Sequence, residues 1–209
     1  MSEQNNLPPK LRFKSASIIQ LYQLTLEAAQ SLYRNNRDFL SLPPDDRSVL
    51  LHSTSTHTGG VSVNFISYKI GLLDYPTYYD SVEISCSATI AKIARRYPPR
   101  LNFDMAVMKL FLAILSFSTF RLTRFPNTSS DNLSNIQEIL RIQDAYIEIT
   151  WRYLLYKYDH QQAVKCFSDF ISCIFIVNEG IGEGLRVQWF TSTMDSITQK
   201  TEQTFSATN

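Results

Sequence analysis

The sequence predicts an all-α fold that forms one domain. Glycine is scarce, with 6 among 209 residues, which disfavours the many tight turns of a β-sandwich. Hydrophobic residues make up 44% of the chain and include 13 Phe and 11 Tyr, so a substantial core can be buried. Apolar residues also recur three and four positions apart over long stretches, which is the spacing of one face of a helix.

The first fifty residues predict a tail, a helix, a break and a second helix. Residues 1–13 are expected to form a disordered tail. Pro43 and Pro44 block helix continuation, and Asp45 and Asp46 then suit the positive end of a new helix dipole. The first helix is predicted from a stripe of positions at helical spacing, namely Ile18, Leu21, Thr25, Ala28 and Leu32.

The middle of the chain is expected to be less regular. Gly59 and Gly60 should loosen or break the second helix, because glycine in a helix interior costs about 1 kcal/mol relative to alanine. Residues 61–79 alternate apolar and polar side chains at their start, which predicts a small β-hairpin. Residues 80–95 predict one helix, which ends before Pro98.

The second half predicts three long helices followed by a polar tail. Ser134 and Gln137 have the spacing of a capping box at the start of one helix. From Thr191 onward the chain is rich in Ser, Thr and Gln, so we expect residues 191–209 to be loose and the folded domain to cover 14–190. The expected helices are 103–117, 134–156 and 163–186.

Composition and charge exclude several classes of protein. Lys and Arg number 20 and Asp and Glu 19, a net charge of +1, so we expect no direct binding of nucleic acid. The 3 cysteines are too few for a disulfide framework or a four-cysteine zinc site, and they fit a reducing compartment. No secretory signal is visible. The longest apolar stretch, near 110–120, is about half of the ~20 residues that span a bilayer, so no membrane insertion is expected.

Catalytic and metal-binding motifs are also missing. His52 and His57 lie five positions apart without a third ligand or a zinc-protease pattern. The glycines at 180–184 lack the preceding strand and the following Lys of a phosphate loop. No Ser, Cys or His arrangement indicates an activated nucleophile. We therefore expect neither an enzyme nor a cofactor or metal site.

The segment around the double proline resembles the signature of the nuclear hormone receptor ligand-binding domain. That signature has Phe, then Leu three positions later, Asp at seven, Gln at eight and Leu-Leu at eleven and twelve. The matching residues are Phe39, Leu42, Asp46, Leu50 and Leu51, while Arg47 replaces the usual Gln. The weaker similarity extends over 14–186. It implies a three-layer antiparallel helical sandwich with an apolar cavity for a lipid-like ligand and a surface groove for amphipathic coregulator helices.

The resemblance also implies two sets of site residues. Arg34 would cap the negative carboxyl end of a bound coregulator helix, and Gln30 and Ser48 make the groove more polar than is usual in the family. The implied groove consists of Gln30, Arg34, Arg47, Ser48, Leu51 and His52. The implied ligand cavity, which would take a neutral apolar molecule, is lined by Thr25, Ala28, Leu32, Ser62, Leu110, Ile114, Ile171 and Ile174.

The sequence departs from the family pattern in two ways that change the expected function. The chain carries no DNA-reading zinc module, and residues 194–209 lack the short activation helix with a Glu between apolar pairs. We expect a regulatory domain in the nucleus, with the cytoplasm as an alternative, that modulates transcription by binding a small lipophilic ligand, coregulator peptides or both. It would act on full receptors and could form homodimers, or heterodimers with another receptor, through 163–186. The alternative is a helical interaction module with a filled core and no ligand.

Overall fold

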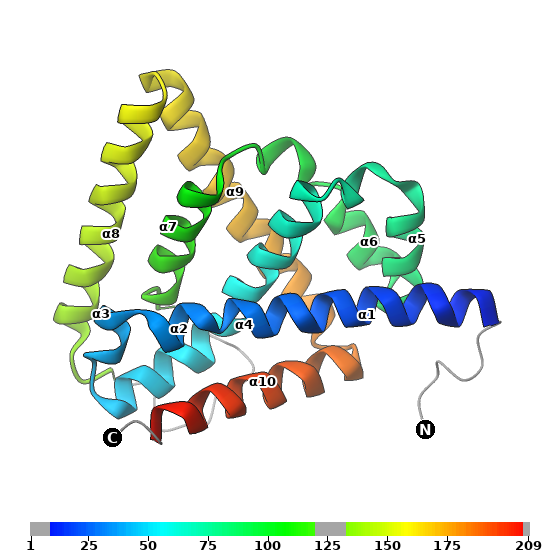
Figure 1. Cartoon of the computed structure of the whole chain (residues 1–209), viewed down its shortest axis with the longest axis horizontal. Helices are drawn as coiled ribbons and strands as arrows, with labels where there is room; N and C mark the ends of the chain where they lie inside the picture. The colour runs from blue at the N-terminus through cyan, green and yellow to red at the C-terminus, as the bar shows by residue number, and fades with distance from the viewer. Residues whose placement is uncertain (1–8, 120–132, 207–209) are drawn as a thin grey trace.

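A computed structural model describes residues 9–119 and 133–206, and within these ranges the chain is helical without a strand (Figure 1). The all-α prediction is therefore confirmed. The elements are α1 (Pro9–Ala29), α2 (Ser31–Asn35), α3 (Arg37–Leu40), α4 (Pro44–Lys69), the 3₁₀ turn η2 (Leu72–Asp74), α5 (Pro76–Ser85), α6 (Ala88–Ala94), the 3₁₀ turn η3 (Pro98–Arg100), α7 (Met105–Ser116), α8 (Ile136–Lys157), α9 (His160–Gly184) and α10 (Gln188–Ser206).

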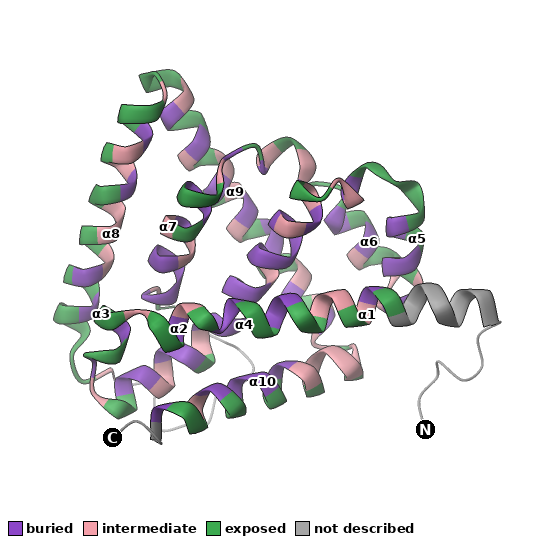
Figure 2. Ribbon diagram, viewed as in Figure 1, coloured by how far each residue is buried: buried purple, intermediate pink, exposed green. Residues whose placement is uncertain are grey.

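Helix α4 is the central element of the fold. It contacts α1, α7, α9 and α10, and its middle is buried on nearly every side (Figure 2). Several of its hydroxyl side chains bond within the helix: Thr54 donates to the carbonyl of Leu50 at 2.7 Å, and Ser62 donates to that of Thr58 at 2.7 Å. Small side chains that bond to their own backbone can be buried without an outside partner, so a rather polar helix can lie in the core.

The expected break at Gly59 and Gly60 is wrong, because α4 runs through both residues without interruption. A Cβ atom at Gly59 would lie 2.5 Å from Cδ2 of Leu26 on α1, and one at Gly60 would lie 3.1 Å from Cγ1 of Val177 on α9. The two glycines therefore let α1 and α9 approach the central helix closely. The packing gained from this approach outweighs the low helix propensity of glycine.

The expected hairpin in 61–79 is also wrong. Val61, Val63 and Phe65 are all buried within α4, and their apolar–polar alternation arises because this helix is enclosed on several sides. After α4 the chain turns at Gly71, whose φ of 73° is the left-handed conformation that glycine adopts without strain.

Residues 80–95 form two helices and not the single one expected. Helix α5 ends at Ser85, and Ser87 caps α6 by accepting a hydrogen bond from the amide of Ile90 at 3.2 Å. The N-cap serine satisfies an amide at the start of a new helix, so α5 and α6 are separate helices.

The start of α8 is held by a residue far away in the sequence. The buried carboxylate of Asp46 accepts hydrogen bonds from the amides of Ser134 at 2.8 Å and Asn135 at 3.1 Å and from the hydroxyl of Ser134 at 3.0 Å. The expected Ser134–Gln137 capping box is wrong, because Ser134 bonds to Asp46 instead. An anion at the positive end of a helix is favourable, so this contact ties α4 to α8. The predicted helix 134–156 itself is confirmed.

Both chain ends contain more helix than expected. Helix α1 already includes residues 9–13, which we expected to be disordered, while residues 1–8 lie outside the described residues. Residues 191–206, expected to be loose, belong to α10. The polar composition of this helix still provides one buried face, formed by Met194, Ile197, Thr198, Thr201 and Phe205. Residues 207–209 lie outside the described residues.

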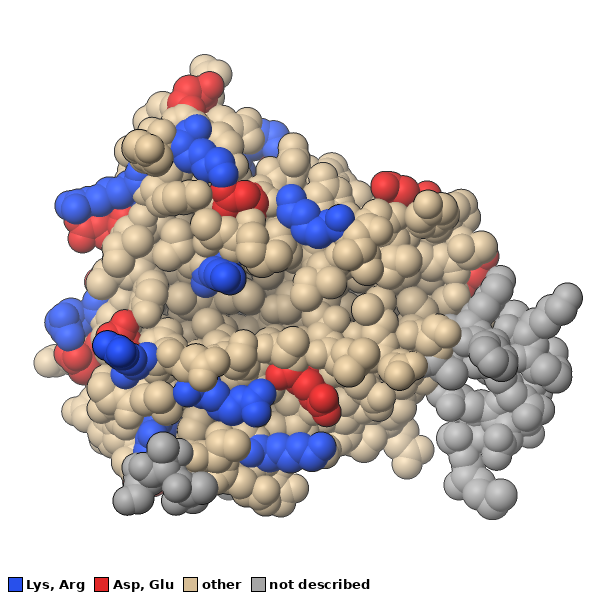
Figure 3. All heavy atoms as spheres, viewed as in Figure 1, with Lys and Arg blue, Asp and Glu red and all other residues tan. Residues whose placement is uncertain are grey.

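The surface carries both charge signs. On the face drawn in Figure 3, Lys and Arg side chains are interspersed with Asp and Glu, and most of the face is uncharged. The strongly apolar helix α7 is largely buried. Across the described ranges, no helix is both long enough and apolar enough to cross a bilayer.

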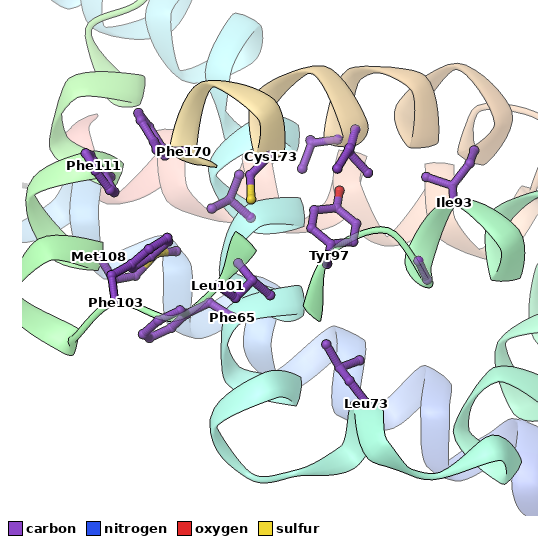
Figure 4. Packing of buried hydrophobic residues seen from close by; sticks show 14 of the residues in the cluster. Phe65, Leu73, Ile93, Tyr97, Leu101, Phe103, Met108, Phe111, Phe170 and Cys173 are labelled. Atoms are coloured by element: carbon purple, nitrogen blue, oxygen red, sulfur yellow. The ribbon is translucent and has the colours of Figure 1, made fainter. Parts of the chain in front are cut away.

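Aromatic stacking joins the helices of the main core. The rings of Phe111 on α7 and Phe170 on α9 stack with centroids 3.8 Å apart, and Phe65 on α4 stacks on Phe103 at 5.5 Å (Figure 4). Stacked pairs contribute beyond their buried area. A second cluster, around the segment that resembles the receptor signature, contains Tyr33, Phe39, Leu42, Leu50, Leu51, Phe117, Ile139, Ile142 and Phe205.

Candidate functional site

Helix α10 packs on the surface formed by α1, α2 and α4, and this covered surface is called the groove below. Helices α10 and α1 lie side by side and run in the same direction (Figure 1). Polar contacts follow this register: Gln23 reaches Thr193 at 3.4 Å near the start of α10, and the hydroxyl of Thr201 donates to Oε1 of Gln30 at 3.4 Å further along. Gln23 on α1 and Gln30, which lies between α1 and α2, therefore both contact α10.

Helix α4 forms the other wall of the groove, and Glu202 of α10 is its main polar partner. Ser48 donates a hydrogen bond to one carboxylate oxygen of Glu202, and Nε2 of His52 lies 3.4 Å from the other. One turn before Glu202 on α10, the hydroxyl of Thr198 lies 3.3 Å from that of Ser55 on α4. The carboxylate lies between the serine and the histidine, so the histidine is not placed as a base for the serine hydroxyl. We interpret this cluster as part of a binding surface for a helix.

The carboxyl end of α10 is anchored by an aromatic ring. Phe205 is buried, and its ring centroid lies 5.8 Å from that of Phe39. The guanidinium of Arg47 lies 5.4 Å from the centroid of the Phe205 ring. Leu51 belongs to the same apolar cluster. This contact combines apolar burial with a cation–π interaction, so it anchors the carboxyl end of α10.

The structure thus brings together most of the residues expected for a coregulator groove. Gln30, Arg47, Ser48 and His52 all contact α10, and Leu51 lies in the cluster that holds Phe205. Arg34 is exposed on α2, a helix that contacts α10, and its guanidinium donates to the carbonyl of Glu27 at 3.4 Å. The groove is occupied by a helix of the same chain, whose polar composition had predicted a loose tail.

The residues expected to line a ligand cavity are not brought together in one. Thr25, Ser62 and Ile114 are buried in the core, while Ala28 and Ile171 are exposed. Thr25 and Ser62 each donate to a carbonyl of their own helix. Leu32, Leu110 and Ile174 are half-buried. None of these eight residues lines the cavity found elsewhere in the fold.

That cavity has a volume of about 80 Å³ and lies between α1, α4, α6, α9 and the start of α10. Tyr22 of α1, Asn64 of α4, Ile93 of α6 and Phe190 of α10 contribute to its wall, together with Tyr97 after α6. Figure 4 shows Tyr97 with its hydroxyl directed toward α9. Sequence reasoning missed this wall because the expected break at 59–60 removed Asn64 from the central helix.

The ionisable groups in the cavity wall stay neutral. Burial raises the pKa of the Cys86 thiol to about 12 and raises the pKa values of Tyr22 and Tyr97 well above their ordinary range. A thiol needs a lowered pKa to act as a nucleophile, so the wall provides a neutral apolar surface and not a reactive centre.

Two further features bear on function. Helix α9 exposes apolar side chains along one side, with Val164 46%, Ile171 46% and Phe175 70% exposed. Among the described residues, no three His, Cys, Asp or Glu side chains cluster in a way that could hold a metal ion.

Comparisons of the chain with protein-family models, with curated proteins and with solved structures found no match.

Proposed function

We propose that this chain is a regulatory domain of the nuclear receptor ligand-binding type, folded as the three-layer antiparallel helical sandwich of that family. It modulates transcription in the nucleus, or acts from the cytoplasm, by binding amphipathic coregulator helices in the groove between α1, α2 and α4. The observation that carries the proposal is that a helix, α10, already occupies this groove.

The direction in which α10 runs across the groove supports the proposal. The carboxyl end of α10 lies against α2, which carries Arg34, and beside Arg47. Cations near the negative end of a helix dipole are favourable. A partner helix that lies in the same direction would present its last carbonyls to these two guanidinium groups, as the receptor resemblance implies for Arg34.

A partner helix richer in leucine can compete with α10. The buried face of α10 includes Thr198 and Thr201, which contribute less apolar area than leucine would. Each fully buried leucine adds on the order of 1.5–3 kcal/mol. Such a partner can therefore displace α10, although α10 has the entropic advantage of being attached to the same chain.

The proposal is tested by titrating a labelled Leu-x-x-Leu-Leu helix peptide and following its fluorescence anisotropy. The variant Phe205→Ala weakens the packing of α10 on the groove, so it should bind the peptide more tightly than the natural chain. In that background, Arg34→Ala should weaken binding about two- to fivefold. The control Arg152→Ala removes an equal charge from α8, where Arg152 is paired with Glu148. Absence of peptide binding to Phe205→Ala, or equal effects of the two arginine variants, contradicts the proposal.

The exposed side of α9 supports the expected self-association or pairing with another receptor through 163–186. Contiguous exposed apolar side chains often mark interaction sites, and Phe175 is the most exposed of the three on α9. This surface lies on α9 and is separate from the residues that hold α10.

The second candidate function is a helical interaction module that binds no lipid. It is favoured by the positions of the eight residues expected to line a ligand cavity, which the structure does not bring together in one. The same groove would serve this module, so the peptide titration tests both readings. Recovery of a co-purified lipid by native mass spectrometry would separate them in favour of the receptor reading.

A further inference from the structure

We infer that the helices bound by the groove carry the pattern Glu-x-x-Phe near their carboxyl end, with the carboxylate bonded to Ser48 and the ring packed against Arg47. This inference rests on the proposed function, because it names the kind of helix that would take the place of α10. It is based on the two contacts that α10 itself makes at this end, through Glu202 and Phe205.

Glu202 and Phe205 face the groove together. They are three positions apart on α10, and residues at this spacing are neighbours on one face of a helix. Their partners Ser48 and Arg47 are adjacent residues near the start of α4. A fixed spacing on the bound helix therefore matches a fixed spacing in the groove, so a partner helix that lies in the same direction must present both groups at this spacing.

The first of the two positions favours a carboxylate over an apolar side chain. Ser48 donates a hydrogen bond to one oxygen of Glu202, and Nε2 of His52 lies 3.4 Å from the other. Hydrogen bonds to a charged group are stronger than those between neutral groups, and both oxygens have a partner here. A leucine at this position would offer neither partner an acceptor. The groove therefore selects a helix with a carboxylate at this position.

The second position favours phenylalanine over leucine. Arg47 is only 6% exposed, and its guanidinium lies over the ring of Phe205. Among the described residues, Nε of Arg47 has no hydrogen-bond acceptor. A buried charge without compensation is unfavourable, and the face of an aromatic ring supplies part of that compensation. Leucine has no such face, and it would also lose the ring contact that Phe205 makes with Phe39.

The experiment titrates a labelled peptide with the sequence of residues 188–206 into the full-length variant Phe205→Ala, in which the packing of the chain's own α10 is weakened. Binding is followed by fluorescence anisotropy. Phe205→Leu in the peptide should weaken binding about tenfold, because the cation–π contact and the aromatic pair are both lost. Glu202→Gln in the peptide should weaken it about fivefold. The control peptide Gln203→Ala changes an exposed side chain and should bind like the natural peptide.

A double-mutant cycle locates the carboxylate in the groove. In the same background, Ser48→Ala should weaken binding of the natural peptide about fivefold. It should hardly affect the Glu202→Gln peptide, because the contact is already removed. Ser53→Ala is the matched control on α4, since the hydroxyl of Ser53 donates to the carbonyl of Leu50 in its own helix at 3.1 Å. The control should change the affinities for both peptides equally.

A second chain variant tests the position of the ring. Arg47→Met keeps a long side chain and removes the charge, so it should reduce the preference for Phe over Leu in the peptide from about tenfold to about threefold. If Arg47→Met does not fold, the Ser48 cycle and the comparison of peptides still decide the matter.

Two results would overturn the inference: equal affinities for the natural, Phe205→Leu and Glu202→Gln peptides, or additive effects of Ser48→Ala and Glu202→Gln. The Leu-x-x-Leu-Leu peptide tests the proposed function separately. If that peptide binds and the peptides based on α10 all bind equally, the inference fails alone. If the α10 peptide binds with the predicted preferences and the leucine peptide does not bind, the pattern stands and the coregulator function fails. A chain that binds neither peptide contradicts both.

Discussion

Removing the ring of Phe205 tests whether α10 is a separately detachable helix. Phe205 lies near the carboxyl end of α10, where its buried ring contacts the ring of Phe39 and the guanidinium of Arg47. The substitution Phe205→Ala deletes this anchor and leaves the backbone of α10 able to remain helical, since alanine has the highest helix propensity.

The expected cost follows from the position of the ring. Truncating a core phenylalanine to alanine costs about 3–5 kcal/mol. Because Phe205 lies on the last turn of the last described helix, its surroundings can relax, and we expect the lower end of this range. About 3 kcal/mol corresponds to roughly a 100-fold increase in the equilibrium constant for local opening of α10.

Hydrogen–deuterium exchange with mass spectrometry measures this opening for each helix. Amides in the carboxyl half of α10 should exchange about 100-fold faster in Phe205→Ala, while those of α7, whose ring Phe111 stacks on Phe170, should keep their protection. The control Gln203→Ala changes an exposed side chain of the same helix and should leave exchange in α10 nearly unchanged.

Two results would refute this reasoning. Equal acceleration in α7 and α10 would mean that Phe205 stabilises the whole domain and that α10 does not open by itself. Unchanged exchange in α10 would mean that the ring is not its anchor in the groove.

The remaining predictions concern stability and self-association. Asp46→Asn removes the charge that holds the start of α8 and should lower the free energy of unfolding by about 2–3 kcal/mol in urea; a loss below about 0.5 kcal/mol, the usual size of a surface substitution, would refute the role of this contact. In the same assay, Gly182→Ala should add about 1 kcal/mol, whereas Gly59→Ala should destabilise the fold, because its Cβ would lie 2.5 Å from Cδ2 of Leu26; equal effects would contradict the close approach of α1. Burial lowers the pKa of His57 in the folded state, so the unfolded chain gains a proton first as the pH falls below about 6.5. The natural chain should therefore lose stability between about pH 7 and 5 more steeply than His57→Gln, and parallel curves would exclude the effect. Phe175→Ser should weaken any dimer seen by analytical ultracentrifugation, and a chain that stays monomeric at all concentrations would exclude the α9 interface.

The helical class and several helix boundaries were already predictable from the amino-acid sequence. The break before Pro44 and the helix 134–156 follow from proline geometry and from apolar spacing, which act within a few residues. The signature around Asp46 and Leu51 also selected most of the residues that meet in one groove. The helical class and the helix boundaries were predictable because each depends on local chemistry or on a pattern with a fixed spacing, whereas the role of the groove residues in binding a coregulator helix stays a prediction.

Long-range packing, in contrast, determines which segments of weak helix propensity become helices and which surfaces they cover. Helix α4 passes through Gly59 and Gly60 because α1 and α9 pack closely against them, and α10 is held by a groove whose walls come from residues far away in the sequence. The cavity beside Asn64 exists only once these helices have met. The physical reason is that short-range propensities differ by about 1 kcal/mol or less, whereas burial of one helix face against its neighbours contributes several times more.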